Sequence, residues 1–229
     1  EKAKTGITTT DALLYGSTKV WANNNTYDNG SSTTITYSFS GTSDLYLFDD
    51  NYSNPDPKVA NVYPFSAVQQ AAVKLALKEF SDVADITFVE VAETAAEVGT
   101  IRVGFSDDSI GAGWAQPPIQ GVDGGDIWLN TVTADQLNSA FERGSGNGTR
   151  AVLLHEIGHA LGLAHPFEGD DRLTEDQDFK NYTLMSYTEP KDADGTRTAW
   201  NDGDYLISST PMVYDIAAIQ HLYGAAVHN

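Results

Sequence analysis

The sequence predicts a single α+β domain. Short stretches typical of strands, with one long helix among them, fill the first part of the 229-residue chain, and helices separated by irregular polar loops fill the rest. Hydrophobic residues make up 41% of the chain and charged residues 20%, as in a globular protein. No internal repeat and no linker divides the chain, so we expect one domain over residues 1–229 that buries its own core.

Five stretches have the pattern of β-strands. The first, Thr33 to Phe39, alternates between apolar and polar residues, so that every second side chain faces the same side. The others lie at Ile86 to Val91, Thr100 to Phe105, Gly113 to Gln116 and Gly125 to Asn130. Pro117 and Pro118 end the fourth stretch, and such a stop is typical of a strand at the edge of a sheet.

Four stretches have helical signals. The clearest begins at Ser66, which can cap the helix while Gln69 completes a capping box, and its apolar stripe runs to Phe80. The other helices are predicted at Thr10 to Tyr15 with Thr10 as the cap, at Thr149 to Leu161, and from Thr210-Pro211 to Gly224. Each of these has either a cap residue at its start or a glycine just past its end, as helices in proteins commonly do.

Two polar stretches are predicted to be irregular. Asp49 to Lys58 contains two prolines and several Asp and Asn residues. These acidic residues lack the ordered spacing of a calcium loop, which favours a surface turn over a calcium site. Thr188 to Thr210 is also expected to be irregular.

The charge and the cysteine content exclude several function classes. The formal net charge is −19, from 32 acidic and 13 basic residues, and this sign opposes binding to phosphate backbones. Without cysteine, the chain has no disulfides, no thiolate zinc ligands and no cysteine catalysis. No apolar run reaches membrane-spanning length. From the charge we expect no nucleic-acid partner, and from the missing apolar run we expect no membrane partner.

Three of the five histidines lie within His155 to His165. His155 and His159 are four residues apart, a spacing that puts both imidazoles on one face of a helix, where they can share one zinc ion. Gly162 allows a left-handed turn that brings His165 back to the same ion. Glu156 stands beside the first ligand, where it can take a proton from a metal-bound water. Three protein ligands and one open position are typical of a catalytic zinc site.

A methionine follows this motif in Thr183-Leu184-Met185-Ser186-Tyr187, twenty residues after His165. The combination of the histidine motif and this methionine resembles the metzincin zinc peptidases, in which a turn with a methionine lies beneath the metal. The alternative without chemistry is a capped helix with surface histidines. The number of motif positions that match together argues against that alternative.

Within the metzincins, the chain resembles the serralysin family of secreted bacterial proteases. The resemblance rests on the histidine motif, on Leu184 to Tyr187, on the final helix from Asp215 to Gly224 and, less specifically, on Phe65 to Ala84. It implies a five-stranded twisted mixed sheet with an antiparallel edge strand, a long helix before the active-site helix, and a C-terminal helix. It also implies an active-site cleft between an N-terminal subdomain of about residues 1–165 and a smaller one of about residues 166–229.

The resemblance assigns roles to residues of this sequence. His155, His159 and His165 would bind zinc, and Glu156 would be the general base. Met185 would support the site from below, and Tyr187 would be a further zinc ligand that also acts in catalysis as a donor to the oxyanion. The edge strand would pair with the substrate backbone through its residues Ala112, Gly113, Trp114 and Ala115.

The function implied by these roles is that of a secreted, extracellular zinc endopeptidase. Its partners would be protein or peptide substrates and a proteinaceous inhibitor, and we expect a monomer. Two alternatives remain open. One is another branch of zinc endopeptidases: astacins share the tyrosine but usually carry disulfides, and matrix metalloproteases lack the tyrosine. The other is a zinc-containing binding or adhesion module without catalysis, against which an intact Glu156 argues.

The sequence departs from the serralysin pattern at its C-terminal end. Serralysins usually continue into glycine- and aspartate-rich repeats that bind calcium, whereas this sequence stops at Asn229, just past the final helix. Either the sequence is the catalytic domain of a longer protein, or it comes from a branch without repeats. In the first case, calcium would bind mainly through the repeat domain, which is not present here. A longer gene would be expected to continue with such repeats.

Overall fold

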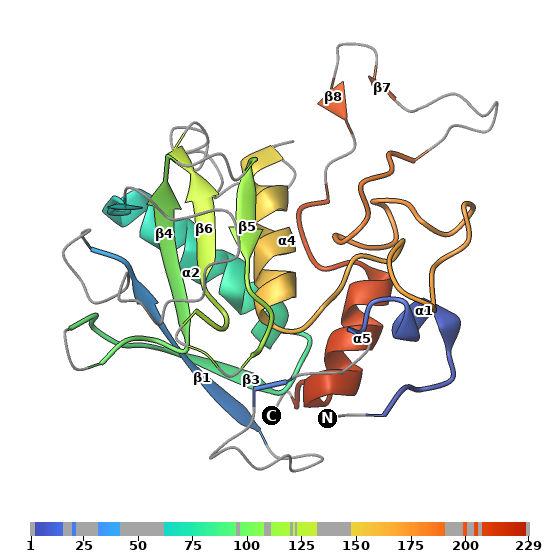
Figure 1. Cartoon of the computed structure of the whole chain (residues 1–229), viewed down its shortest axis with the longest axis horizontal. Coiled ribbons are helices and arrows are strands. Elements are labelled where there is room, and N and C mark those ends of the chain that lie inside the picture. Colours follow the sequence, from blue (N-terminus) through green and yellow to red (C-terminus); the bar gives the residue numbers. More distant parts are fainter. Residues whose placement is uncertain are drawn as a thin grey trace.

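A mixed sheet forms the larger half of the fold in the computed structural model (Figure 1). The structure describes residues 3–15, 20–21, 32–41, 62–94, 97–107, 111–119, 121, 123–131, 148–190, 199–200, 204–205 and 208–227. Five strands follow the order β3-β1-β4-β6-β5. Their bounds are β1 Thr33–Phe39, β3 Ile86–Glu90, β4 Ile101–Ser106, β5 Gly113–Ala115 and β6 Ile127–Asn130. The pairs β1–β3, β1–β4 and β4–β6 are parallel, and β5 pairs antiparallel with β6 at the edge. The five-stranded sheet with an antiparallel edge strand is thus confirmed.

Three short strands were not predicted from the sequence. Strand β2, Val62–Tyr63, pairs antiparallel with the end of β4 beyond the part of β4 that β1 covers, which makes the sheet six-stranded. Strands β7, Ala199–Trp200, and β8, Asp204–Tyr205, form a small antiparallel sheet. The prediction that Thr188 to Thr210 is wholly irregular was therefore wrong, because two-residue strands are too short to show an alternating pattern.

Two helices pack together against the sheet (Figure 1). They are α2, Ala67–Ser81, and α4, Gly148–Ala160. The capping box of α2 is formed as predicted: the Gln69 backbone N–H donates to Ser66 Oγ over 3.3 Å, and the Ser66 N–H donates to Gln69 Oε1 over 2.8 Å. The apolar stripe of α2 is buried, with Phe80 fully inaccessible. Burying one such side chain stabilises the fold by about 1.5–3 kcal/mol, so this stripe fixes the helix on which α4 rests.

Two further helices of the described residues, α1 at Thr8–Asp11 and α5 at Val213–Tyr223, pack against each other. The prediction that Thr10 caps the first helix was wrong, because Thr10 lies inside α1 and is buried. Asp11 instead organises this turn: its carboxylate accepts the N–H groups of Thr5 and Gly6 over 2.7 and 2.8 Å.

The last helix begins at Val213, two residues after the predicted start at Pro211. The Asp215 carboxylate, in the first turn of α5, accepts the Met212 N–H over 2.8 Å. This acceptor, which lies inside the helix, satisfies an N–H at the helix start, where intrahelical partners are missing.

In the described part of the chain, no helix combines the length and the apolar character that crossing a membrane requires. The loop predicted at Asp49 to Lys58 lies outside the described residues.

Candidate metal centre

The end of α4 brings the histidine motif into position. Helical spacing places His155 and His159 one turn apart. The helix then ends at Ala160, and Gly162, two residues further on, has a φ of 105°, in the left-handed region. The Leu163 N–H donates to Gly158 O and the Gly162 N–H donates to His159 O, each over 2.9 Å, which is the double hydrogen bond of a Schellman motif. The chain reverses at this point, as the glycine predicted.

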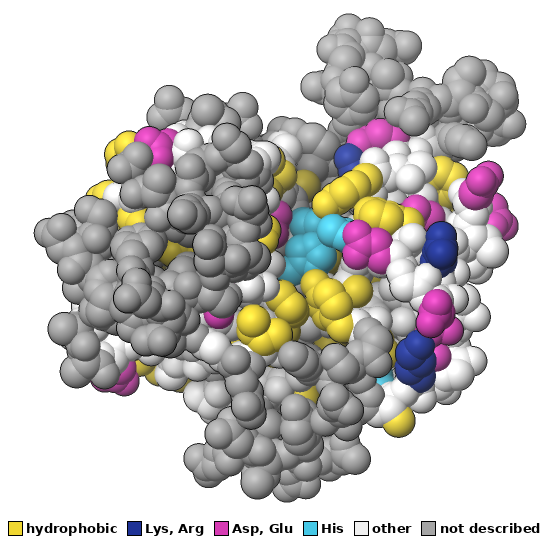
Figure 2. All heavy atoms as spheres, in the orientation of Figure 1, with side chains coloured by type: hydrophobic (Ala, Val, Ile, Leu, Met, Phe, Trp, Pro, Cys, Tyr) yellow, Lys and Arg dark blue, Asp and Glu magenta, His cyan; other side chains and the backbone are white. Residues whose placement is uncertain are grey.

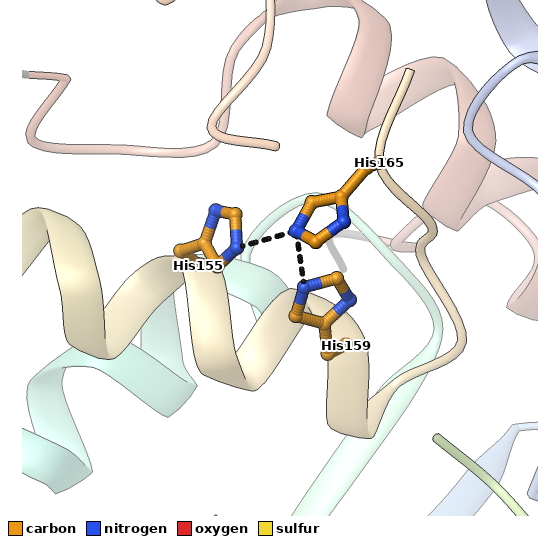
Figure 3. A group of neighbouring side chains, drawn as sticks. All are labelled: His155, His159 and His165. Carbon is orange, nitrogen blue, oxygen red and sulfur yellow. Dashed lines mark hydrogen bonds between the residues drawn. The ribbon is translucent and has the colours of Figure 1, made fainter. Parts of the chain in front are cut away.

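The reversal brings the three imidazoles together (Figure 3). His165 Nε2 lies 3.1 Å from His159 Nε2 and 3.3 Å from His155 Nε2. Each of the three side chains offers one ligand atom to a common point. Among the described residues, this is the group of His, Cys, Asp and Glu side chains that could hold a metal ion.

The opposite ring nitrogens of these histidines have partners of their own. His155 Nδ1 lies 2.8 Å from Leu184 O, and His159 Nδ1 lies 2.8 Å from Leu163 O. Because a carbonyl oxygen only accepts, both Nδ1 atoms carry the proton. His165 Nδ1 lies 3.1 Å from Glu168 Oε1, another acceptor. All three Nε2 atoms therefore present lone pairs to one point, an arrangement that suits a cation and that is usual for histidines holding zinc.

Burial favours the neutral form of two of these histidines. Burial lowers the pKa of His155 to about 4, and it lowers the pKa of His159 well below the ordinary value of 6.5. Neutral imidazole is the form that binds a metal ion. A donor set of three imidazoles therefore fits zinc.

Met185 lies beneath this group and is fully buried. A Cβ atom placed on Gly158 would come within 2.8 Å of Met185 Sδ, so the glycine in α4 is what allows the thioether to approach the helix. The Met185 N–H also donates to Thr183 Oγ1 over 3.0 Å. The turn around the methionine thus packs directly under the helix that carries two of the histidines.

A buried carboxylate holds this turn in place. Asp215 of α5 is fully inaccessible. Its Oδ1 accepts the Thr183 hydroxyl over 2.6 Å, and its Oδ2 accepts the Leu184 N–H over 2.8 Å. Leu184 in turn offers its carbonyl oxygen to His155. The last helix therefore reaches a histidine of the centre through two hydrogen bonds.

The Glu156 side chain lies between its own helix, α4, and the edge strand β5. It is 6% exposed, and burial raises the pKa of its carboxyl to about 8. A Cβ atom on Gly113 of β5 would lie 3.1 Å from both Cγ and Oε1 of Glu156. The glycine lets the strand pass directly over the carboxylate.

Tyr187 reaches the same centre from the other side. Its hydroxyl lies 2.9 Å from His165 Nε2, and its ring stacks on His155 with centroids 5.6 Å apart. The residue is 62% exposed, so its phenol group lies at the surface of the site. Phe167 also stacks on His165, with centroids 5.0 Å apart.

The predicted substrate-binding residues form the free edge of the described sheet, because β5 pairs with β6 on one side only. The Asn130 N–H donates to Ala112 O over 3.0 Å, which extends this pairing. Ala112 is exposed, Gly113 and Trp114 are half-buried and Ala115 is buried.

The histidines reach the surface in a recess. Figure 2 shows them near the middle of this face, with hydrophobic side chains above and below them. The recess lies between the half that carries the sheet and the half that carries α1 and α5.

Four contacts of the centre were not predicted: those of Tyr15, Phe167, Glu168 and Asp215. The sequence carried a local signal for Asp215 alone. It lies in the first turn of the last helix, where an acidic residue often accepts hydrogen bonds from nearby N–H groups. The Tyr15 hydroxyl lies 3.1 Å from His159 Nδ1, across 144 residues of sequence, and no local pattern reports such a contact.

The sequence matches the Matrixin family over residues 60–180, more than half of the chain. The chain belongs to this family. The Met-zincin family matches residues 141–228, which contain the histidine motif, the methionine turn and the last helix. The chain is thus a metzincin, and zinc is the metal that membership of this group implies.

Curated relatives narrow the assignment. The metzincin is 38% identical over 172 residues to Metalloprotease AprA of Pseudomonas entomophila, an alignment that covers 70% of this chain and 34% of the relative. It is 36% identical over 181 residues to Serralysin A of Dickeya chrysanthemi, covering 76% and 36%. It is 32% identical over 240 residues to Serralysin B of the same organism, covering 97% and 45%. These similarities confirm the serralysin family and favour it over an astacin-like branch, and the chain spans between a third and a half of the length of these relatives.

Proposed function

We propose that this chain is a zinc endopeptidase domain that hydrolyses peptide bonds in proteins. The observation that carries the proposal is the convergence of three histidine Nε2 atoms, 3.1 and 3.3 Å apart, beside a buried glutamate. His155, His159 and His165 would hold the ion. The similarity to proteins named metalloprotease and serralysin supports the same reaction class.

Glu156 is the proposed general base. A zinc ion bound to three imidazoles supplies a Lewis acid that lowers the pKa of a water molecule. Glu156 would take a proton from the attacking water and return it to the leaving amine. Its carboxyl lies buried against the edge strand, next in sequence to His155, and this position supports both steps.

Tyr187 is the proposed hydrogen-bond donor to the developing oxyanion, and also the further ligand implied by the family. Its hydroxyl group lies at the histidine cluster and its ring is held on His155. Preorganised donors of this kind stabilise transition-state charge without reorganisation. Met185 is the proposed support beneath the ion.

The edge of β5 is the proposed substrate platform. An extended peptide can add to it as a further strand, with main-chain hydrogen bonds to Ala112, Gly113, Trp114 and Ala115. Because Gly113 lies against Glu156, a peptide on this edge would pass close to the base.

The setting of the enzyme follows from the resemblance to serralysins. We propose that the chain acts as a secreted, extracellular monomer on protein or peptide substrates and that a proteinaceous inhibitor can occupy the cleft. Calcium would bind through a repeat domain outside this chain. We also propose two subdomains, of about residues 1–165 and about residues 166–229, with the recess between them.

Digestion of casein by the purified chain, with and without 1,10-phenanthroline, tests the proposed function. We expect proteolysis that the chelator abolishes. Glu156→Gln should retain zinc and lose nearly all turnover, because it removes the base and leaves the ligands in place. Glu97→Gln, at an exposed glutamate remote from the centre, is the matched control and should digest casein normally. Zinc binding without proteolysis in the wild-type chain would favour the alternative, a zinc-containing binding module.

A further inference from the structure

The N-terminal segment, residues 3–15, runs directly beside the turn between the second and third histidines. Leu14 pairs with Leu163 in an antiparallel bridge, and the Ala164 N–H donates to Leu13 O over 2.9 Å. Leu13 is fully inaccessible. The residues immediately before His165 are therefore held by the start of the chain as well as by α4.

Tyr15 follows this pairing and contacts the centre itself. Its hydroxyl oxygen lies 3.1 Å from His159 Nδ1, and the two ring centroids are 6.5 Å apart. The same Nδ1 lies 2.8 Å from Leu163 O. The N–H of this imidazole is thus shared between a backbone carbonyl and a phenol oxygen, both of which can accept it.

The N-terminal segment is anchored independently of the metal centre. Asp11 closes its turn with hydrogen bonds from Thr5 and Gly6, and α1 packs on α5. His221 of α5 also lies with its Nε2 2.8 Å from Ala3 O. Tyr15 is therefore presented to the centre by a segment that is fixed at several points to the C-terminal part of the chain.

From this arrangement we infer that Tyr15 is a positioning residue for the zinc ligand His159, and that the N-terminal segment supports the metal centre through Tyr15. The inference rests on the proposed zinc site. Tyr15 does not face the point where the three Nε2 atoms meet, because it contacts the opposite nitrogen of the ring. Its effect is to hold the orientation of the imidazole and to keep the proton on Nδ1, which leaves Nε2 free for the ion.

Partners of this kind influence the affinity for the metal. Removing one typically costs about 10- to 100-fold in metal affinity or activity. Because Leu163 O remains as a second acceptor for the same N–H, we expect Tyr15→Phe to lie near the lower limit, with zinc affinity about 10-fold weaker.

The test is a zinc titration of the metal-free full chain in competition with a chelator of known affinity, for wild type and Tyr15→Phe. Tyr37→Phe is the matched control. The Tyr37 hydroxyl donates to Glu90 Oε2 over 3.3 Å. Both residues lie in the paired strands β1 and β3, towards the edge of the sheet opposite β5. Thermal unfolding of each metal-free protein checks the fold. The absorption spectrum of the cobalt(II)-substituted protein reports the geometry around the metal.

We expect Tyr15→Phe to weaken zinc binding about 10-fold and to alter the cobalt spectrum, with a metal-free stability close to that of Tyr37→Phe. Equal zinc affinity in wild type and Tyr15→Phe would overturn the inference. Equal weakening in both variants would also overturn it, because the loss would then be a general effect of removing a buried hydroxyl. A wild-type chain that binds no zinc would overturn the proposed function, and this inference with it.

Discussion

Replacing Asp215 should loosen the methionine turn and, through it, the metal centre. The carboxylate is fully buried and accepts three hydrogen bonds, from the Thr183 hydroxyl and from the N–H groups of Leu184 and Met212. Asp215→Ala would leave two buried donors and one part-buried donor without this acceptor. Each costs about 1–3 kcal/mol, and relief of the buried charge offsets part of the sum, so we expect a loss of about 3 kcal/mol in the free energy of unfolding.

The assay is urea unfolding of the metal-free protein at pH 7, with zinc affinity measured on the same samples. Asp215→Asn keeps one acceptor oxygen and should lose less than Asp215→Ala. Asp82→Ala is the matched control, because Asp82 is part of a largely exposed pair with Lys78 on the surface. Such a pair contributes only about 0.3–0.5 kcal/mol. A loss below about 1 kcal/mol for Asp215→Ala would refute the reasoning, since one unsatisfied buried donor alone costs that much.

The pH dependence of the same variants has a defined sign. Burial raises the pKa of Asp215 from 3.8 to about 6 in the folded state. The folded protein therefore takes up this proton before the unfolded chain does, so the group stabilises the fold at low pH and loses that contribution as the pH rises through about 6. Lowering the pH from 7 to 5 should stabilise wild type by about 1 kcal/mol relative to Asp215→Asn.

Three further substitutions probe other parts of the site and of the fold. Tyr187→Phe should keep zinc affinity and lower kcat by about 100- to 1,000-fold with little change in KM, in steady-state kinetics on a peptide; a kcat near that of wild type would make Tyr187 a packing residue. Arg150→Met breaks a buried ion pair with Glu79 of 3.1 Å and should cost about 3–5 kcal/mol in urea unfolding; a loss below about 1 kcal/mol would contradict this. Gly158→Ala gains about 1 kcal/mol in helix propensity, but its Cβ would lie 2.8 Å from Met185 Sδ, and overpacking costs about 1–3 kcal/mol. We therefore expect a lower melting temperature and weaker zinc binding, and a stabilised variant would contradict the overlap.

The histidine cluster could be predicted because its geometry is local. The spacing of His155 and His159 is set by the helical repeat, and the left-handed Gly162 sets the direction of the chain after α4. The turn towards His165 begins with hydrogen bonds between residues three and five apart in the sequence. The same holds for the capping box at Ser66, which depends on residues only three apart.

The supporting contacts could not be predicted because they depend on how distant segments pack. Tyr15 and His159 lie 144 residues apart in the sequence, and Asp215 and Leu184 lie 31 apart, so both contacts depend on tertiary packing. Phe167 stacks on His165, which is only two residues away, but no sequence pattern around Phe167 indicates that stacking. We expect these contacts to decide how firmly the three histidines are held, which the motif alone does not report.

Most strands of the sheet could be predicted within two residues at each end, because their apolar runs are bounded by turn residues. Strand β2 was missed because its two residues are ordered by the free end of β4 rather than by their own pattern. The first helix was displaced for a similar reason: Thr10 is a good cap in isolation, but the three hydrogen bonds to Asp11 start the helix earlier.

X-ray absorption at the zinc edge of the purified, zinc-loaded chain tests the central claim most directly. The claim is that one zinc ion is held by the Nε2 atoms of His155, His159 and His165. It predicts one zinc per chain, three imidazole nitrogens at about 2.0–2.1 Å, and any remaining ligand an oxygen. In His165→Ala one of these imidazoles should be lost. A spectrum with fewer than three imidazoles in the wild-type chain, or one that His165→Ala leaves unchanged, would contradict the account.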